Sequence, residues 1–157
     1  MALGWKLVVD AADPYRQAAF WAAALEYETE DNSVLIGKLL GIGAIDDSVL
    51  AEADGRRYFR DAVAVRHPDD PYDEETGIGQ GRRLLFQRVP EAEQRIAEGA
   101  ERPKNPLHID VHAGPGQREA TVARLESLGA TVQRHVTEPQ GEWTVLEDPE
   151  GNVFCVA

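Results

Sequence analysis

Two histidines and an aspartate alternate with aliphatic residues in the stretch NPLHIDVHAG, residues 105–114. Successive side chains of an extended chain point to opposite faces, so we expect His108, Asp110 and His112 on one face. Imidazole and carboxylate groups are ligands for zinc, iron and nickel, and an imidazole beside a carboxylate can also act as a general base. The stretch therefore predicts a polar strand face whose chemistry depends on what the fold brings next to it.

The length and composition indicate one domain that needs no structural metal. A chain of 157 residues can bury a core without disulfides. We find no run of about 18 apolar residues and no basic segment followed by an apolar run at the N-terminus, which predicts a cytoplasmic protein. The single cysteine, Cys155, has no partner for an intramolecular disulfide, and its apolar neighbours favour a buried thiol.

The chain is strongly acidic, with 28 Asp and Glu residues against 16 Lys and Arg residues and a formal net charge of -12. Such a field repels phosphate backbones and anionic lipid headgroups, so we expect neither nucleic acid nor membrane partners. The same field attracts a cationic ligand. The alternative, which the composition favours, is that the acidity serves only solubility.

The elements that must position the polar face fall into two halves. The first half is predicted to contain a strand at 5–11, a helix at 14–25 capped by Asp13, two short helices at 33–40 and 46–53, a strand at 58–65 and a closing strand at 84–89. The two short helices belong to an insertion at 31–55. A polar, proline-punctuated linker follows at 91–105 and has room for a short helix.

The second half, from residue 106, repeats the order of the first without an insertion. It is predicted to contain a strand at 107–113, a helix ending near Leu128, and strands at 131–136, 142–147 and 152–157. The last two strands are joined by the turn sequence Asp148-Pro149-Glu150-Gly151. Both halves are thus β-α-β-β-β modules, the first over 1–90 and the second over 106–157.

Three segments carry a family resemblance: DPYRQAAFWAAAL, RLLFQRVPE with the following PLHIDV, and GEWTVLEDPEGNVFCV. With the two modules, they resemble the vicinal oxygen chelate superfamily, in its branch with glyoxalase I, bleomycin-resistance proteins and extradiol dioxygenases. The resemblance implies an α+β fold in which two modules curl a mixed sheet into a cup. Helices would cover its convex side, and a ligand or metal would lie on its concave side.

The resemblance also implies where metal ligands would come from. Metal-dependent members use the first and last strands of each module, which correspond here to Lys6 and Gln87 in the first half and His108 and Cys155 in the second. A lysine repels a divalent ion and a glutamine is a weak ligand, so we expect no metal and no other cofactor. An unorthodox site of His108, Asp110, His112 and Cys155 stays open, although the two histidines would be about 13 Å apart along an extended strand.

The candidate site residues follow from these positions. His108 and Asp110 are candidate catalytic residues, and the candidate ligand-binding residues are Lys6, Gln87, His112, Trp143 and Cys155. The expected function is metal-independent binding of a small molecule between the modules. The alternatives are an enzyme of the same superfamily that uses His108 as base or metal ligand, and an interaction module whose cup is filled by its own side chains. The resemblance also implies a homodimer.

Overall fold

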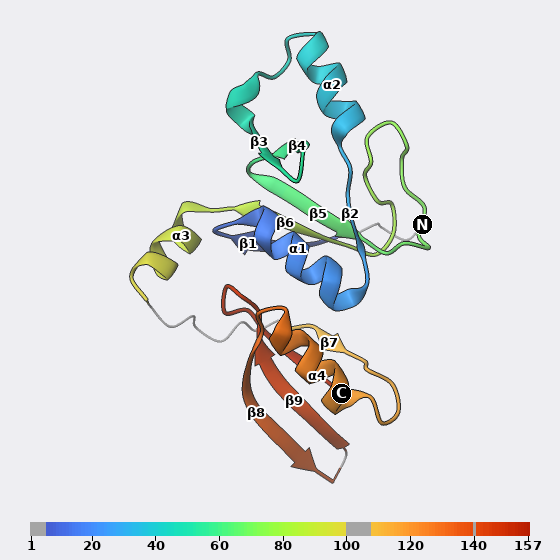
Figure 1. The fold of residues 1–157 in the computed structure, drawn as a ribbon, viewed down its shortest axis with the longest axis vertical. Coiled ribbons are helices and arrows are strands. Elements are labelled where there is room, and N and C mark those ends of the chain that lie inside the picture. The colour runs from blue at the N-terminus through green and yellow to red at the C-terminus, as the bar shows by residue number, and fades with distance from the viewer. Residues whose placement is uncertain (1–5, 100–107, 140) are drawn as a thin grey trace, which may run out of the picture. The chain divides into compact units, whose positions relative to one another are not determined.

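The structure is a computed structural model, and it describes residues 6–99, 108–139 and 141–157. The chain forms two compact units, Met1–Glu93 and Gln94–Ala157 (Figure 1). Each unit contains a four-stranded mixed sheet, which confirms the predicted α+β class. None of the described helices is long and apolar enough to cross a membrane.

The sheet of the first unit has one helix packed on it. Its strands follow the order β1-β6-β5-β2, with β1 (Leu7–Ala11) parallel to β6 (Arg83–Arg88) and with β5 (Ala62–Arg66) antiparallel to both β6 and β2 (Glu28–Thr29). The helix α1 spans Pro14–Leu25, as predicted, and the Asp13 side chain accepts a hydrogen bond from the Arg16 backbone N–H. The capped turn therefore fixes where the first strand ends.

The core of the first unit lies between α1 and one face of this sheet. Ala18 and Trp21 of α1 are buried, as are Val65 of β5 and Phe86 of β6. These positions follow the helical and strand periods read from the sequence. The side chains that alternate with them, such as Gln87, point to the opposite, exposed face.

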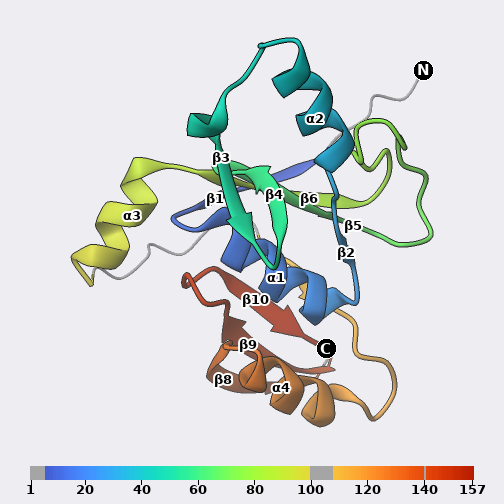
Figure 2. The ribbon, with the colours of Figure 1, turned by 45° about the horizontal axis from the view of Figure 1, so that its top comes forward.

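The insertion contains a β-hairpin that the sequence reading missed. Helix α2 (Ser33–Gly41) is close to its prediction, but the helix expected at 46–53 is wrong: a single 3-10 turn at Asp47–Val49 leads into β3 (Leu50–Ala53). Strand β3 pairs antiparallel with β4 (Arg56–Phe59) through a turn at Asp54 and Gly55, whose φ angles are 51° and 72°. Two positive φ angles are typical of the tight hairpin turn whose twist matches its strands (Figure 2).

The strand expected at 58–65 is also divided. It consists of the end of β4 and most of β5, with Arg60 and Asp61 between them. The Arg60 N–H donates to the Val49 carbonyl at 3.0 Å, and the Arg88 N–H donates to the Asp61 carbonyl at 2.8 Å. With these bonds the chain leaves β3, the partner of β4, and joins β6, the partner of β5. No local sequence pattern indicates this change of pairing strand.

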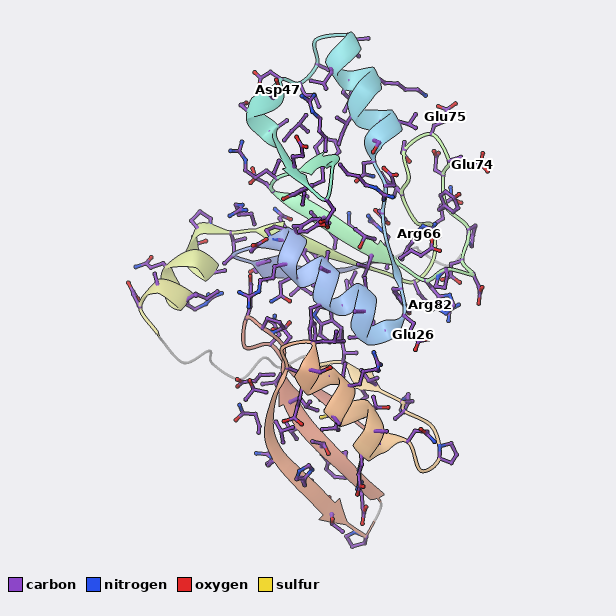
Figure 3. All side chains as sticks on the ribbon, viewed as in Figure 1. Glu26, Asp47, Arg66, Glu74, Glu75 and Arg82 are labelled. Atoms are coloured by element: carbon purple, nitrogen blue, oxygen red, sulfur yellow. The ribbon has the colours of Figure 1, made fainter. Side chains whose placement is uncertain are left out.

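A long loop, residues 67–82, connects β5 to β6 and is anchored by a buried carboxylate. Both oxygens of Glu30 accept hydrogen bonds from Arg83 at 2.7 Å, and one also accepts from the Gly79 N–H at 2.8 Å. The Arg66 guanidinium lies 3.9 Å from the centre of the Tyr72 ring. Figure 3 shows Glu74 and Glu75 farther along this loop, where both are exposed. The bond from Gly79 therefore holds the glycine-rich part of the loop against Glu30.

The second unit repeats the arrangement of one helix on a mixed sheet. Its elements are α4 (Arg118–Ser127) and the strands β7 (Asp110–Val111), β10 (Val153–Val156), β9 (Gly141–Glu147) and β8 (Thr131–Glu138), in that sheet order. Val122 and Leu125 of α4 are buried with Leu146 and Phe154 of the sheet. The helix and the last three strands confirm their predictions, and α3 (Pro90–Ala97) lies in the polar segment where a short helix was allowed.

The strand expected at 107–113 is shorter than predicted. Within the described residues only Asp110 and Val111 pair as a strand, and Leu107 lies outside the described residues. Strand β7 is parallel to β10, and the Ala113 N–H continues the contact by donating to the Ala157 carbonyl at 2.9 Å. This parallel pair positions the candidate site.

Candidate functional site

Three of the candidate residues meet on the sheet of the second unit. His108, Asp110 and Cys155 each offer one ligand atom, and these three atoms lie within 4.8 Å of one another. His108 Nε2 is 3.4 Å from Asp110 Oδ1. We call these residues the His108 cluster.

The register of β7 and β10 brings Cys155 into the His108 cluster. Cys155 is the direct partner of Asp110, and its N–H donates to the Ile109 carbonyl at 2.9 Å. The turn before β10 supports this register, since the buried Asp148 carboxylate accepts from the Asn152 backbone N–H at 2.9 Å and from its side chain at 2.6 Å. Paired neighbours point to the same face, so the thiol joins the carboxylate and the imidazole.

The face that carries the His108 cluster is partly apolar and partly open to water. The side chains of His108 and Asp110 are 48% and 55% exposed. Cys155 is half-buried, so its thiol is less buried than the sequence predicted. Val145 is the partner of Cys155 on β9, and Trp143, two residues earlier, lies on the same face and is half-buried. The predicted pocket aromatic therefore shares its face with the polar residues.

The donor set of the His108 cluster suits two kinds of chemistry. Thiolate, imidazole and carboxylate are all zinc ligands, and three protein ligands leave one position of a tetrahedral ion for water or substrate. Without an ion, Asp110 can orient the His108 imidazole, which then donates a proton to a bound molecule or accepts one from it. The set fits either use.

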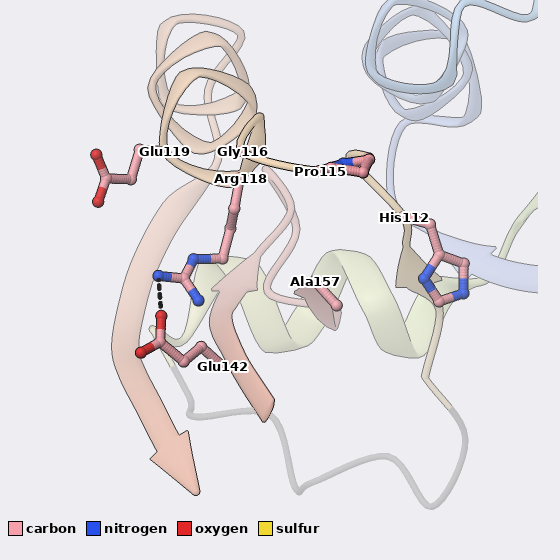
Figure 4. A pocket seen from close by; sticks show the side chains of 8 residues that line it. His112, Pro115, Gly116, Arg118, Glu119, Glu142 and Ala157 are labelled. Carbon is pink, nitrogen blue, oxygen red and sulfur yellow. Dashed lines mark hydrogen bonds and ion pairs between the residues drawn. The ribbon is translucent and has the colours of Figure 1, made fainter. Parts of the chain in front are cut away.

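His112 does not join the His108 cluster. Strand β7 ends at Val111, and His112 lines a separate hollow of about 630 Å³ with Pro115, Arg118 and Glu142 among its other walls (Figure 4). Arg118 donates to Glu142 at 2.8 Å across this hollow. The structure thus brings His108 and Asp110 together, while His112 lies farther along the chain.

In the first unit, Lys6 and Gln87 lie on one exposed face but far apart. Gln87 is the partner of Asp10 on β1, and Lys6 lies just before β1, four residues before Asp10. In an extended chain, residues that are an even number of positions apart point to the same face, and four positions span about 13 Å. The two residues therefore reach a common ligand only through their side-chain lengths or through a ligand that extends along the strand.

The register corrects the correspondence that the resemblance implied between the modules. Gln87 pairs with Asp10 in the first unit, as Cys155 pairs with Asp110 in the second. Asp10 is therefore the counterpart of Asp110, and the counterpart of His108 is Val8, not Lys6. The position that holds an imidazole in the second unit holds an aliphatic side chain in the first.

Sequence reasoning did not single out Asp10, although the order of residues in the two modules contains the signal. Counting back from the ends of the two parallel strand pairs aligns Asp10 with Asp110, whereas counting back from the helix caps does not. His135, whose direction the strand period leaves open, lies beside α4, where its Nδ1 is 2.9 Å from the Thr144 hydroxyl. It is on the opposite face from the His108 cluster, since its partner Thr144 alternates with Val145.

Comparisons with known proteins place this geometry in a family. The family model described as "Glyoxalase-like domain" matches residues 6–157. A glyoxalase/bleomycin resistance protein/dioxygenase family enzyme from Burkholderia phytofirmans PsJN is 14% identical, with a TM-score of 0.55, and 96% of this chain and 94% of that chain are covered. The fosfomycin resistance protein FosX from Mesorhizobium loti is 11% identical, with a TM-score of 0.56 and coverage of 99% and 91%.

A hypothetical protein from S. aureus, SA1046, is 12% identical, with a TM-score of 0.53, over 99% of this chain and 93% of that chain. At these identities the structural similarities show the fold alone. No curated protein matches the sequence. The family model, in contrast, covers both modules and the strands that carry the His108 cluster. The chain therefore belongs to the glyoxalase-like domain family, within the vicinal oxygen chelate superfamily.

Proposed function

We propose that this protein binds a small molecule on the face of the second sheet that carries the His108 cluster, and that it does so without a metal ion. The single observation that carries the proposal is the meeting of His108, Asp110 and Cys155 within 4.8 Å on an accessible face. Trp143 and Val145 add apolar area to the same face. Ligand sites combine such apolar area with a few convergent polar groups.

The first unit supports the metal-free part of the proposal. The counterparts of His108 and Cys155 there are Val8 and Gln87, an aliphatic residue and a neutral amide. Neither is a good ligand for a divalent ion.

The proposal gives each predicted residue a role. Asp110 orients His108, which exchanges a hydrogen bond with the ligand, and Trp143 contacts the apolar part of the ligand. Lys6, Gln87, His112 and Cys155 are further ligand-binding residues, as the concave sides of the modules in this superfamily imply. A cationic ligand is favoured because the net charge is -12. The protein is a cytoplasmic homodimer in this proposal.

The same cluster supports a second candidate function, a metal-dependent enzyme. Three donors of the types that bind zinc lie within 4.8 Å, the arrangement of a catalytic site with one open position. In that case His108, Asp110 and Cys155 would hold the ion, which would polarise a substrate oxygen when bound. Without an ion, the His108 and Asp110 pair could also act as a general base for a lyase or an isomerase.

Metal content separates the two candidates. Untagged protein is produced in medium supplemented with zinc, iron, nickel and manganese salts, and bound metals are counted by elemental mass spectrometry beside a thermal melt with and without chelator. We expect well below one ion per chain and no chelator-dependent shift in Tm. Near-stoichiometric metal that is lost in His108→Ala, but kept in His135→Ala, would reject the metal-free proposal in favour of the enzyme.

Ligand binding tests whether the small molecule lies on the face that carries the His108 cluster. A library of small amphipathic amines and neutral analogues is screened by ligand-observed NMR, and each binder is measured again with His108→Ala and Trp143→Ala. We expect about tenfold or greater weakening in both variants, as for loss of a central contact in a ligand site. The matched control is His135→Ala, which removes a histidine from the opposite face. Equal affinities for the unsubstituted protein and all three variants would show that the ligand binds elsewhere.

A further inference from the structure

We propose that the insertion builds a second small-molecule site, in the first unit, that takes a small organic cation such as a primary amine. The site is a cavity of about 320 Å³ between α1, the β3–β4 hairpin and the chain that leads from β2 into α2. Its polar and aromatic walls include Tyr15, Thr29, Asp31, Asp54, Arg56 and Tyr58, and Glu30, Asn32 and Arg57 line it as well. We call it the insertion pocket.

The insertion pocket is distinct from the face on which Gln87 lies. Tyr15 and Ala19 of α1 line it together with Val63. Val63 pairs with Phe86, which is buried on the α1 side of the sheet, whereas Gln87 points to the other side. The pocket therefore lies mainly on the helix side of the first unit, although Ala62, the strand partner of Gln87, is also one of its walls.

Contacts between the hairpin and α1 hold the pocket together. The rings of Tyr15 and Tyr58 are stacked with their centroids 4.6 Å apart and their planes 25° apart. The Tyr15 hydroxyl donates a hydrogen bond to Asp54 Oδ2 at 2.7 Å. This bond places the turn of the hairpin against the helix and raises the pKa of Tyr15 above its ordinary value. The ring pair also offers the π surface that attracts organic cations.

The distribution of charge inside the pocket favours a ligand with a positive charge. Glu30 is matched by Arg83, and Arg57 is matched by Asp47 at 3.2 Å. Asp31 accepts from the Ser33 N–H and hydroxyl and lies 3.8 Å from Arg56. Asp54 differs from these carboxylates, because among the described residues its side chain bonds only to the neutral Tyr15 hydroxyl. One carboxylate thus remains without a cation beside a pair of aromatic rings.

The rest of the pocket suits a compact ligand with an apolar body. Ala19, Ala53 and Ala62 line it with small side chains. A volume of about 320 Å³ is at the small end of ligand sites, which favours a ligand of metabolite size. Asp54, Arg56 and Tyr58 all come from the inserted hairpin or its neighbour in sequence, so a module without the insertion would lack this site.

The test uses 2-phenylethylamine as the probe, with its neutral analogue 2-phenylethanol, and measures both affinities by calorimetry with the full chain. The key variant is Asp54→Asn, which keeps an oxygen acceptor for Tyr15 but removes the charge. We expect about tenfold weaker binding of the amine in Asp54→Asn, and about tenfold weaker binding of the alcohol to the unsubstituted protein, from loss of a charge pair near aromatic rings. Tyr58→Ala should weaken amine binding as well.

Two matched controls make the result specific. Glu52→Gln removes an exposed carboxylate from the same hairpin and should leave the amine affinity unchanged. His135→Ala, on the helix side of the second sheet, should also leave it unchanged, whereas loss of amine binding in His108→Ala would place the amine on the second sheet. Undetectable amine binding, equal affinity for the alcohol, or equal weakening by Glu52→Gln and Asp54→Asn would each overturn the insertion pocket. Circular dichroism and Tm confirm that each variant is folded.

Discussion

At the scale of single residues, Asp70 has the most perturbed protonation among the described carboxylates. Its oxygens accept hydrogen bonds from the Arg82 backbone N–H at 2.6 Å and from the Arg82 guanidinium at 2.7 and 3.0 Å. These bonds favour the ionised form, so Arg82 holds the pKa of Asp70 well below its usual range. The pair links the start of the 67–82 loop to its end, just before β6.

This pair predicts a defined loss of stability in acid. Because the folded-state pKa of Asp70 is below the unfolded value of about 3.9, the unfolded chain binds more protons between those two values. The contribution of Asp70 is therefore complete above about pH 4 and is lost as the pH falls through the folded-state value. We expect Asp70→Asn to lower Tm at pH 6 and to flatten the fall of Tm between about pH 4 and 2.

The measurement is a series of thermal melts by circular dichroism from pH 6 to pH 2. Asp69→Asn is the matched control, since Asp69 is an exposed neighbour for which no carboxylate hydrogen bond is described. Parallel pH curves for the unsubstituted protein and Asp70→Asn would show that the Arg82 bonds contribute equally to the folded and unfolded states. The fall of Tm in acid would then come from carboxylates other than Asp70.

The candidate site shows which residue-level features a sequence can predict. The two-residue spacing of His108 and Asp110 predicted their common face, because strand alternation is a local property. Cys155 joins them only through the register of β7 against β10, two segments about 45 residues apart, and register depends on the whole sheet. His112 lies beyond the end of β7 and lines a separate hollow, and its place on the common face stays a prediction.

At the scale of elements, the β3–β4 hairpin was missed although its signal is local. Asp46 does cap a turn, since its carboxylate accepts from the Ser48 N–H at 2.7 Å, but only a 3-10 turn follows it. The Asp54-Gly55 pair is the strongest short-range signal for a hairpin, whereas the Asp46 cap by itself indicates a helix. The division between β4 and β5 had no comparable signal, because it depends on bonds to Val49 and Arg88.

Gly77 of the 67–82 loop gives a prediction at this scale, with Gly55 of the hairpin turn as its control. Gly77 and Gly55 have similar positive φ angles, 75° and 72°, but a Cβ at Gly77 would lie 2.0 Å from the Asp31 carbonyl oxygen, whereas one at Gly55 would meet nothing within 4 Å. Gly55→Ala should therefore lower the free energy of unfolding by about 1 kcal/mol, the cost of a left-handed conformation alone. Gly77→Ala should lower it by about 3 kcal/mol or more, since backbone must also move.

Urea unfolding followed by tryptophan fluorescence measures both free energies. Because the two substitutions share the conformational cost, their difference reports the close approach of the loop to Asp31. Equal free energies for Gly55→Ala and Gly77→Ala would mean that the loop moves away at no cost. The loop would then not be held by its packing on Asp31 and Glu30.

At the scale of the whole molecule, the two units repeat one plan, and the sequence predicts this repeat well. Each unit places one helix on a mixed sheet in which the first strand is parallel to the last, β1 with β6 and β7 with β10. The apolar periods of helices and strands encode that plan. The exact correspondence between the units is encoded in strand register instead, which explains why Lys6 was aligned with His108 in place of Val8.

The net charge of -12 also acts on the whole chain and gives a prediction for salt. The folded state brings 28 carboxylates and 16 cationic side chains into a smaller volume, and the excess of 12 negative charges repels itself more there than in the unfolded chain. Salt screens this repulsion over a Debye length that falls from about 30 Å at 0.01 M to about 10 Å at 0.1 M. We therefore expect the urea midpoint at pH 7 to rise with sodium chloride over this range.

The exposed ion pairs oppose this trend, because the same salt weakens them. Pairs such as Lys38 with Glu75 and Arg57 with Asp47 are open to water and each contributes little, about 0 to 1 kcal/mol. The excess charge should therefore dominate at pH 7. Near the isoelectric point of about 4.7 the excess vanishes, so the rise with salt should disappear or reverse there. A urea midpoint that falls with salt at pH 7 would show that the ion pairs, and not the net charge, control the electrostatic part of stability.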